Sequence, residues 1–354
     1  MFGKLMNNYY YGKSGKGDFR KDDMPETRMQ LFWDTLRTRL SGLCRLSLMY
    51  TLIWIPAMVV ILASAGRIYS NLNMFMLVQN NDYAGYVQYV EDSKGEVAVT
   101  EEEYNKLKST EVNLGDYLYS SIFTMLLILF PCIAITGPCT AGICYVTRNW
   151  ARDEHAFIWS DFKDAVKANW KIPLILSTIT GALPMLVYQG WVTYGQMASN
   201  NMILVVPQML VLLLGIVWAL CITYMHPMTV TYDLKFSGVI RNGLLLGIAR
   251  LPMSVGIRLL HCVPALIAFI AVWFFGLDLM MALMLLGAYY VLIGFGLSRF
   301  VTASYTNAVF DRFINSRIEG APVNKGLREK EEDDSDEEES EEEAAGKPTG
   351  ETEE

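Results

Sequence analysis

Long apolar segments constrain this chain more than any other feature of its sequence. A helix needs about 20 predominantly apolar residues to cross the hydrocarbon core of a bilayer, whereas helices in soluble cores are shorter and striped. Six segments of the 354-residue chain meet that description, at roughly 43–65, 117–136, 172–193, 202–224, 257–275 and 279–298. We therefore expect an all-α polytopic membrane protein, with about six transmembrane helices in contact with the lipid bilayer.

The distribution of lysine and arginine predicts the orientation of these helices. If both termini are cytoplasmic, all but four of the 29 basic residues lie on the cytoplasmic side, as the positive-inside rule requires. The exceptions, all in the first long loop, are Arg67, Lys94, Lys106 and Lys108. A three-residue turn, 276–278, is short enough to force the fifth and sixth segments into an antiparallel hairpin.

The polar segments divide the chain into regions. Residues 1–42 are expected to form a cytoplasmic tether with an interfacial helix at about 29–40, followed by a membrane domain over 43–314. Residues 66–116 are expected to form a small extracellular α+β domain, with a strand pair around Lys94-Gly95 and a helix capped by Thr100. Residues 315–354 end in EKEEDDSDEEESEEE and are expected to be a disordered acidic cytoplasmic tail.

Few residue patterns in this chain predict catalysis or metal binding. No Asp or Glu lies in the middle of a predicted span, which argues against a proton-driven pump. Arg258 and His261 are interpreted as interfacial anchors near the inner end of the fifth span, and the six cysteines as small buried hydrophobes. We expect no enzyme activity, cofactor, metal site or nucleic-acid partner.

The stretch 137–162, GPCTAGICYVTRNWARDEHAFIWSDF, concentrates specific polar residues between the second and third spans. Gly137-Pro138 is expected to end the preceding helix, and Ser160 to cap an interfacial helix with an aromatic anchor at 157–159. These residues suit docking to a partner, and they also suit plain structural anchoring. The candidate docking motif comprises Gly137, Pro138, Arg148, Asn149, Arg152, Glu154, His155, Asp161 and, from a second polar stretch, Asn242.

Three stretches resemble a known family. GPCTAG at 137–142, followed by YVTRNWARDEHAFIWSDFKDAVKANWK, resembles the signature of the YesL family of small bacterial membrane proteins of unknown function. The stretches PMTVTYDLKFSGVIRNGLLLGIARLP at 227–252 and SYTNAVFDRFI at 304–314 are similar to further parts of that family. The amino-terminal run, from GKSGKGDFR to LMYTLIWIPAMVV, resembles the longer clostridial-type members. In typical members the first apolar segment leads almost directly into the GPxTAG-like motif, whereas here a loop and an extra span intervene.

The resemblance implies a location in the bacterial cell membrane and an accessory or regulatory role in carbohydrate uptake, because members are often encoded beside carbohydrate ABC transporters. ABC transporter subunits or a homo-oligomer are the implied partners. Two alternatives remain open at this point. In the first alternative the chain is itself a small-solute transporter or channel. In the second it is a sensor whose outer loop binds a ligand. In the sensor, Tyr83, Tyr86 and Tyr89 either stack on a sugar or pack against their neighbours.

Overall fold

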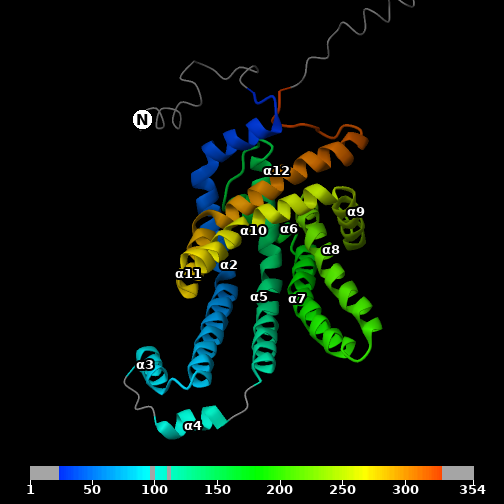
Figure 1. The fold of residues 1–354 in the computed structure, drawn as a ribbon. Coiled ribbons are helices and arrows are strands. Elements are labelled where there is room, and N and C mark those ends of the chain that lie inside the picture. Colours follow the sequence, from blue (N-terminus) through cyan, green and yellow to red (C-terminus); the bar gives the residue numbers. More distant parts are fainter. Residues whose placement is uncertain (1–23, 96–99, 110–112, 329–354) are drawn as a thin grey trace, which may run out of the picture.

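The computed structural model describes residues 24–95, 100–109 and 113–328, and these residues form a helical protein without strands (Figure 1). Six helical runs are long and apolar enough to cross a membrane, which confirms the number expected from sequence. Their bounds are Arg28–Gln79 (α2), Leu114–Trp150 (α5), Lys171–Ala198 (α7), Met202–Thr229 (with α8, Val205–Thr229), Leu251–Phe275 (α10) and Leu279–Arg317 (with α11, Leu279–Tyr289, and α12, Phe295–Phe313). The shorter helices are α3 (Tyr83–Lys94), α4 (Glu101–Ser109), α6 (Ser160–Ala168) and α9 (Phe236–Ala249).

Several helices extend well beyond the apolar segments that predict them. The helix expected over 29–40 and the first span are one continuous helix, α2, which contains 52 residues. Its start is marked not by the apolar pattern but by Thr27, whose hydroxyl accepts the backbone N–H of Gln30 in a capping box.

The expected break at Gly137-Pro138 is wrong, because α5 runs through both residues without interruption. Membrane helices tolerate proline where neighbouring groups satisfy the freed carbonyls. Thr136 and Thr140 lie on either side of the pair, and their hydroxyls bond the carbonyls of Ile133 and Thr136 within the same helix. The helix therefore carries the GPCTAG residues into the helical bundle.

The hairpin predicted at 276–278 is present as expected. Helix α10 ends at Phe275, Gly276 adopts a left-handed conformation (φ 67°), and Asp278 caps α11 by accepting the N–H of Met281 at 3.0 Å. In Figure 1 α10 and α12 cross obliquely over the ends of α5, α7 and α8.

The described part of the excursion between α2 and α5 contains the helix α3 where a strand pair was expected, and the helix α4 where a helix was expected. Residues 83–94 form α3, while 96–99 lie outside the described residues. Tyr86 and Val90 are buried against Tyr104 of α4 and Val78 of α2, and the Tyr83 and Tyr104 rings meet edge to face at 5.0 Å. The alternation of apolar residues in this segment predicts a strand, but the contact with α4 favours a helix, in which these residues share one face. The helix expected after Thr100 is confirmed, since Glu103 N–H contacts the Thr100 hydroxyl at 3.4 Å.

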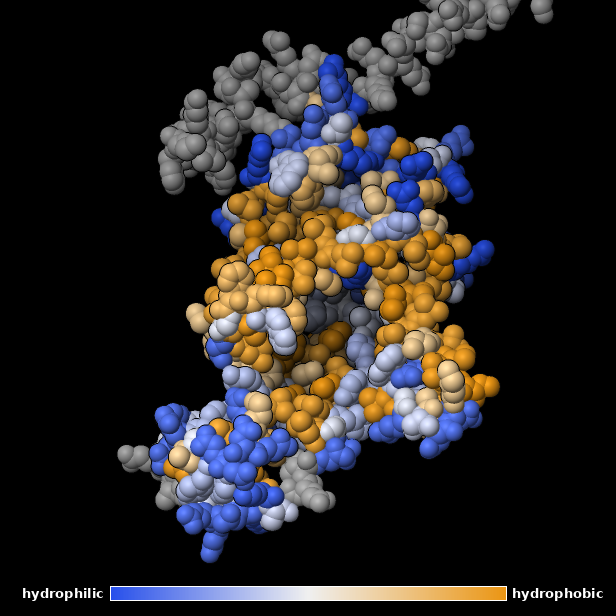
Figure 2. All heavy atoms as spheres, in the orientation of Figure 1, coloured by the Kyte–Doolittle hydropathy of each residue, from blue (hydrophilic) through white to orange (hydrophobic). Residues whose placement is uncertain are grey.

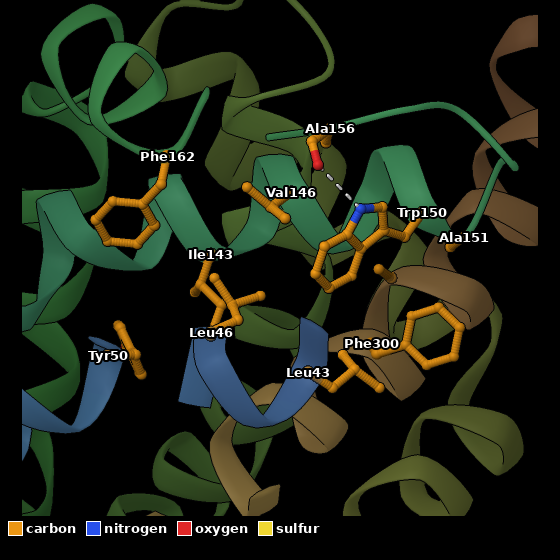
Figure 3. Packing of buried hydrophobic residues seen from close by; sticks show 11 residues of the cluster. Leu43, Leu46, Tyr50, Ile143, Val146, Trp150, Ala151, Ala156, Phe162 and Phe300 are labelled. Carbon is orange, nitrogen blue, oxygen red and sulfur yellow. Dashed lines mark hydrogen bonds between the residues drawn. The ribbon is translucent and has the colours of Figure 1, made fainter. Parts of the chain in front are cut away.

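The largest core lies where α2, α5 and α12 meet (Figure 3). Leu43 and Leu46 of α2 pack against Ile143 and Trp150 of α5, and Phe300 of α12 closes one side. The Trp150 indole N–H donates to the Ala156 carbonyl at 3.4 Å. Away from this core, apolar side chains cover the outside of the molecule and form a broad band between two polar ends (Figure 2).

Part of the segment predicted as a disordered tail is packed on the protein. Residues 315–328 follow α12, and the Arg328 N–H donates to the Pro25 carbonyl at 3.0 Å. The Arg328 guanidinium also lies 3.6 Å from Glu26. The strongly acidic residues 329–354 lie outside the described residues.

Candidate functional site

The glycines of the GPCTAG motif allow other helices to approach α5 closely. A Cβ on Gly137 would overlap the Pro173 carbonyl oxygen and lie 2.7 Å from the Leu174 Cα on α7. A Cβ on Gly142 would lie 2.6 Å from the ring of Phe162 on α6. Gly137 therefore helps to place the start of α7, and Gly142 helps to place α6, while Pro138 lies half-buried inside α5.

Arg148 and Asn149 connect the end of α5 to neighbouring segments. Arg148 donates from Nη1 to the Val230 carbonyl at 3.0 Å, in the loop between α8 and α9. The Arg148 carbonyl accepts from the Asn307 side chain of α12 at 3.3 Å. Asn149 is buried, and its carbonyl accepts the N–H groups of Arg152 and Glu154 at 3.0 and 2.8 Å.

Arg152 and Glu154 bind the segment that follows α12. The Lys325 ammonium lies 2.6 Å from the Glu154 carboxylate, and the Arg152 Nε lies 3.8 Å from it. Gly326 has a φ of 84°, and a Cβ there would lie 2.8 Å from the Arg152 carbonyl oxygen. Both features require glycine at this position. The motif residues thus hold the carboxyl-terminal segment of the described chain in place.

Beyond Glu154 the loop presents exposed aromatic groups. His155 is exposed and its ring meets Phe157 edge to face at 4.5 Å. Asp161 accepts the Phe157 N–H at 2.8 Å and so fixes this turn. Ser160 does not cap α6 as expected, because it is already the first residue of that helix. Trp159 is also exposed, so both aromatic rings at 157 and 159 lie on the surface, and their role as a membrane anchor stays a prediction.

The remaining predicted residue, Asn242, lies apart from this group. It is half-buried on α9, which packs on α8 through close contacts at Gly243 and Gly247. The structure therefore groups the motif residues from Arg148 to Asp161 and leaves Asn242 on a different helix.

Sequence reasoning missed a polar network beside these residues. Asp311 accepts from Arg28 at 2.6 Å, from the Asn315 side chain at 2.6 Å and from the Asn324 N–H at 3.1 Å. Tyr232 donates to the Asn315 side-chain oxygen at 2.7 Å. Burial, followed by the nearby Asp311 carboxylate, raises the pKa of Tyr232 to about 12. In the sequence, this network could have been suspected only from Asp311, a single acidic residue near the end of an apolar helix.

The two parts of the sequence that carry the family resemblance meet at a cleft. The cleft has a volume of about 490 Å³ and lies between the α6–α7 junction and the α8–α9 loop. Trp170 and Lys171 line one side, with the ammonium 5.8 Å from the ring centroid. Tyr232 and Asp233 line the other side. Both Trp170 and Asp233 are exposed.

Arg258 and His261 differ from the simple anchors expected from sequence. The His261 ring contacts the Ser298 carbonyl at 3.0 Å and the Thr302 hydroxyl at 3.2 Å, and so joins α10 to α12. The Arg258 guanidinium is half-buried and its Nε has no hydrogen-bond partner.

The fold therefore defines an all-helical multi-pass membrane protein with a polar end built around the 137–162 stretch. Residues 117–191 match the family model described as "Protein of unknown function, DUF624". The chain is also 28% identical over 154 residues to the uncharacterized protein YesV of Bacillus subtilis (strain 168), in a match that covers 41% of this chain and 73% of that protein. Both similarities support a relationship to a YesL/DUF624-like family. No solved structure matches the chain.

Proposed function

We propose that this protein is a non-catalytic accessory subunit of a membrane complex, and that the cleft between the α6–α7 junction and the α8–α9 loop receives a segment of its partner. The proposal rests on one observation: two blocks that are far apart in the sequence line the same cleft. One block supplies Trp170 and Lys171, and the other supplies Tyr232 and Asp233.

The chemistry of the cleft suits a peptide segment. Exposed Trp170 offers a large apolar surface, and tryptophan is enriched among the residues that contribute most to binding at interfaces. Lys171 and Asp233 offer one charge of each sign at the rim, which suits recognition of an amphipathic segment. The Arg148–Val230 bond joins the loop that carries Asp233 to α5, and Gly137 of α5 packs against the start of α7, so both sides of the cleft are attached to α5.

The partner that we propose is a carbohydrate ABC-type importer in a bacterial cell membrane, with the polar end on the cytoplasmic side. The support for this choice is the resemblance to the YesL family. The lack of a carboxylate in the middle of the apolar helices supports a role other than proton-driven transport.

Affinity purification in a mild detergent tests the proposal. The tagged protein, produced in cells grown on an inducing carbohydrate, should recover the transporter subunits, and Trp170→Ala and Asp233→Lys should each abolish their recovery. Trp273→Ala is the matched control, because Trp273 is 73% exposed at the far end of α10 and should retain the partners. Recovery of a single homogeneous protein, or equal recovery by all variants, would refute the proposal.

A further inference from the structure

Three helices bring basic side chains together inside the bundle. Arg258 lies three residues before His261 on α10, and Arg299 follows Ser298 on α12. The His261–Ser298 contact at 3.0 Å therefore places both arginines beside the same crossing. His226 of α8 is 5% exposed and lies within electrostatic range of both.

Several polar atoms at this position are buried without a hydrogen-bond partner. They are the Arg258 Nε, the His226 Nδ1 and the Thr223 Oγ1. Thr223 and His226 are three residues apart on α8 and therefore share one face of that helix. Buried polar atoms in folded proteins almost always have a protein, water or ligand partner, so these three atoms are available to a polar ligand.

No carboxylate in the described part of the chain compensates these charges. Arg299 donates a side-chain hydrogen bond to Tyr50 and lies near Cys144, while Arg258 lies near Arg299, Cys262 and Cys221. Removing a charge from water costs several kcal/mol unless it is paired, and two like charges in proximity increase that cost. Arginines within membrane segments are rare and usually mark a functional site.

An apolar groove leads to this group of charges. Its volume is about 340 Å³, and Arg258 is its one charged lining residue among those described. Six α8 residues line it, and all but Trp218 follow the helical repeat of one face: Leu212, Gly215, Ile216, Trp218, Ala219 and Ile222. The same face of α8 continues to His226, so the groove and the buried donors follow one stripe.

We propose that Arg258, Arg299 and His226 form a binding site for a phosphate oxyanion. Guanidinium groups bind phosphate with two parallel hydrogen bonds, and two arginines supply enough donors to surround one anion. The anion comes either from the headgroup of an anionic phospholipid, whose acyl chain would occupy the groove, or from free phosphate. In both cases the same side chains bind the same group.

Native mass spectrometry of the detergent-purified protein tests this site. Wild-type protein should retain phosphatidylglycerol in preference to phosphatidylcholine of the same chain length, and Arg258→Gln and Arg299→Gln should each weaken retention by about tenfold or more. Arg241→Gln, an exposed position on α9, removes the same charge and should bind like wild type. Calorimetric titration with inorganic phosphate, on the same variants, then distinguishes the two sources of the anion.

Thermal unfolding provides a second readout, and it distinguishes a variant that has lost binding from a variant that has lost its fold. Without ligand, Arg258→Gln and Arg299→Gln should unfold at a higher temperature than wild type, because each removes a partly buried charge that no carboxylate balances. With phosphatidylglycerol or phosphate, only wild type and Arg241→Gln should gain stability. Equal binding by wild type and both glutamine variants, equal weakening by Arg241→Gln, or no binding of either probe would overturn the proposal.

Discussion

Replacing Gly137 by alanine tests the close approach of α5 and α7. The added Cβ would lie 2.7 Å from the Leu174 Cα and 2.8 Å from the Pro173 carbonyl carbon, where ordinary contacts begin at 3.4 Å. The helices must therefore separate by about 1 Å, because the nearest atom in the way is the Pro173 carbonyl oxygen, and backbone atoms cannot rotate aside. Overpacking of this kind costs about 2–3 kcal/mol, and the better helix propensity of alanine returns up to about 1 kcal/mol.

The net expectation is a loss of about 1–2 kcal/mol, measured as a lower unfolding midpoint by circular dichroism in one detergent. Gly256→Ala is the matched control, because Gly256 is also helical, lies on α10, and would have nothing within 4 Å of an added Cβ. That variant should gain up to about 1 kcal/mol from helix propensity alone. If Gly137→Ala proves as stable as Gly256→Ala, the proposed role of Gly137 in helix packing is incorrect.

Three further changes probe other parts of the structure. Asp311→Asn should lower stability by about 1–2 kcal/mol in denaturant titrations, because the charged acceptor for Arg28 is lost; an unchanged midpoint would contradict the network. Burial favours the neutral phenol of Tyr232. The stability that this phenol contributes to the folded protein is therefore complete below pH 10 and declines as the pH rises toward its pKa of about 12. The difference in midpoint between wild type and Tyr232→Phe should therefore shrink over that interval, and a constant difference would argue against it. Gly276→Ala should cost about 1 kcal/mol in the same assay, since alanine is strained at a φ of 67°.

The apolar segments and local turn signals were sufficient to predict much of this architecture. The six membrane helices, the turn at Gly276 and the helix after Thr100 follow from residue patterns within short windows. The continuation of α5 through Pro138 does not, because it depends on α7 packing against Gly137. The helix α3 was missed for the same reason, since Tyr104 of α4 decides which face of 83–94 is buried.

The candidate site was predicted only in part. The motif supplied Arg148, Arg152 and Glu154, but their partners at Val230 and Lys325 lie far away in sequence. The buried arginines were hidden because each lies near the end of an apolar segment, where snorkelling to the interface is the ordinary interpretation. Only the crossing of α10 and α12 places them together.

The contact between Arg328 and Pro25 has a consequence for the segments beyond it. The two ends of the described chain are joined by a 3.0 Å hydrogen bond, so residues 1–23 and 329–354 are attached at one point of the molecule. The first segment carries Lys4, Lys13, Lys16, Arg20 and Lys21, whereas the second is strongly acidic. Loss of the Arg328–Pro25 hydrogen bond would therefore affect the attachment points of both segments together.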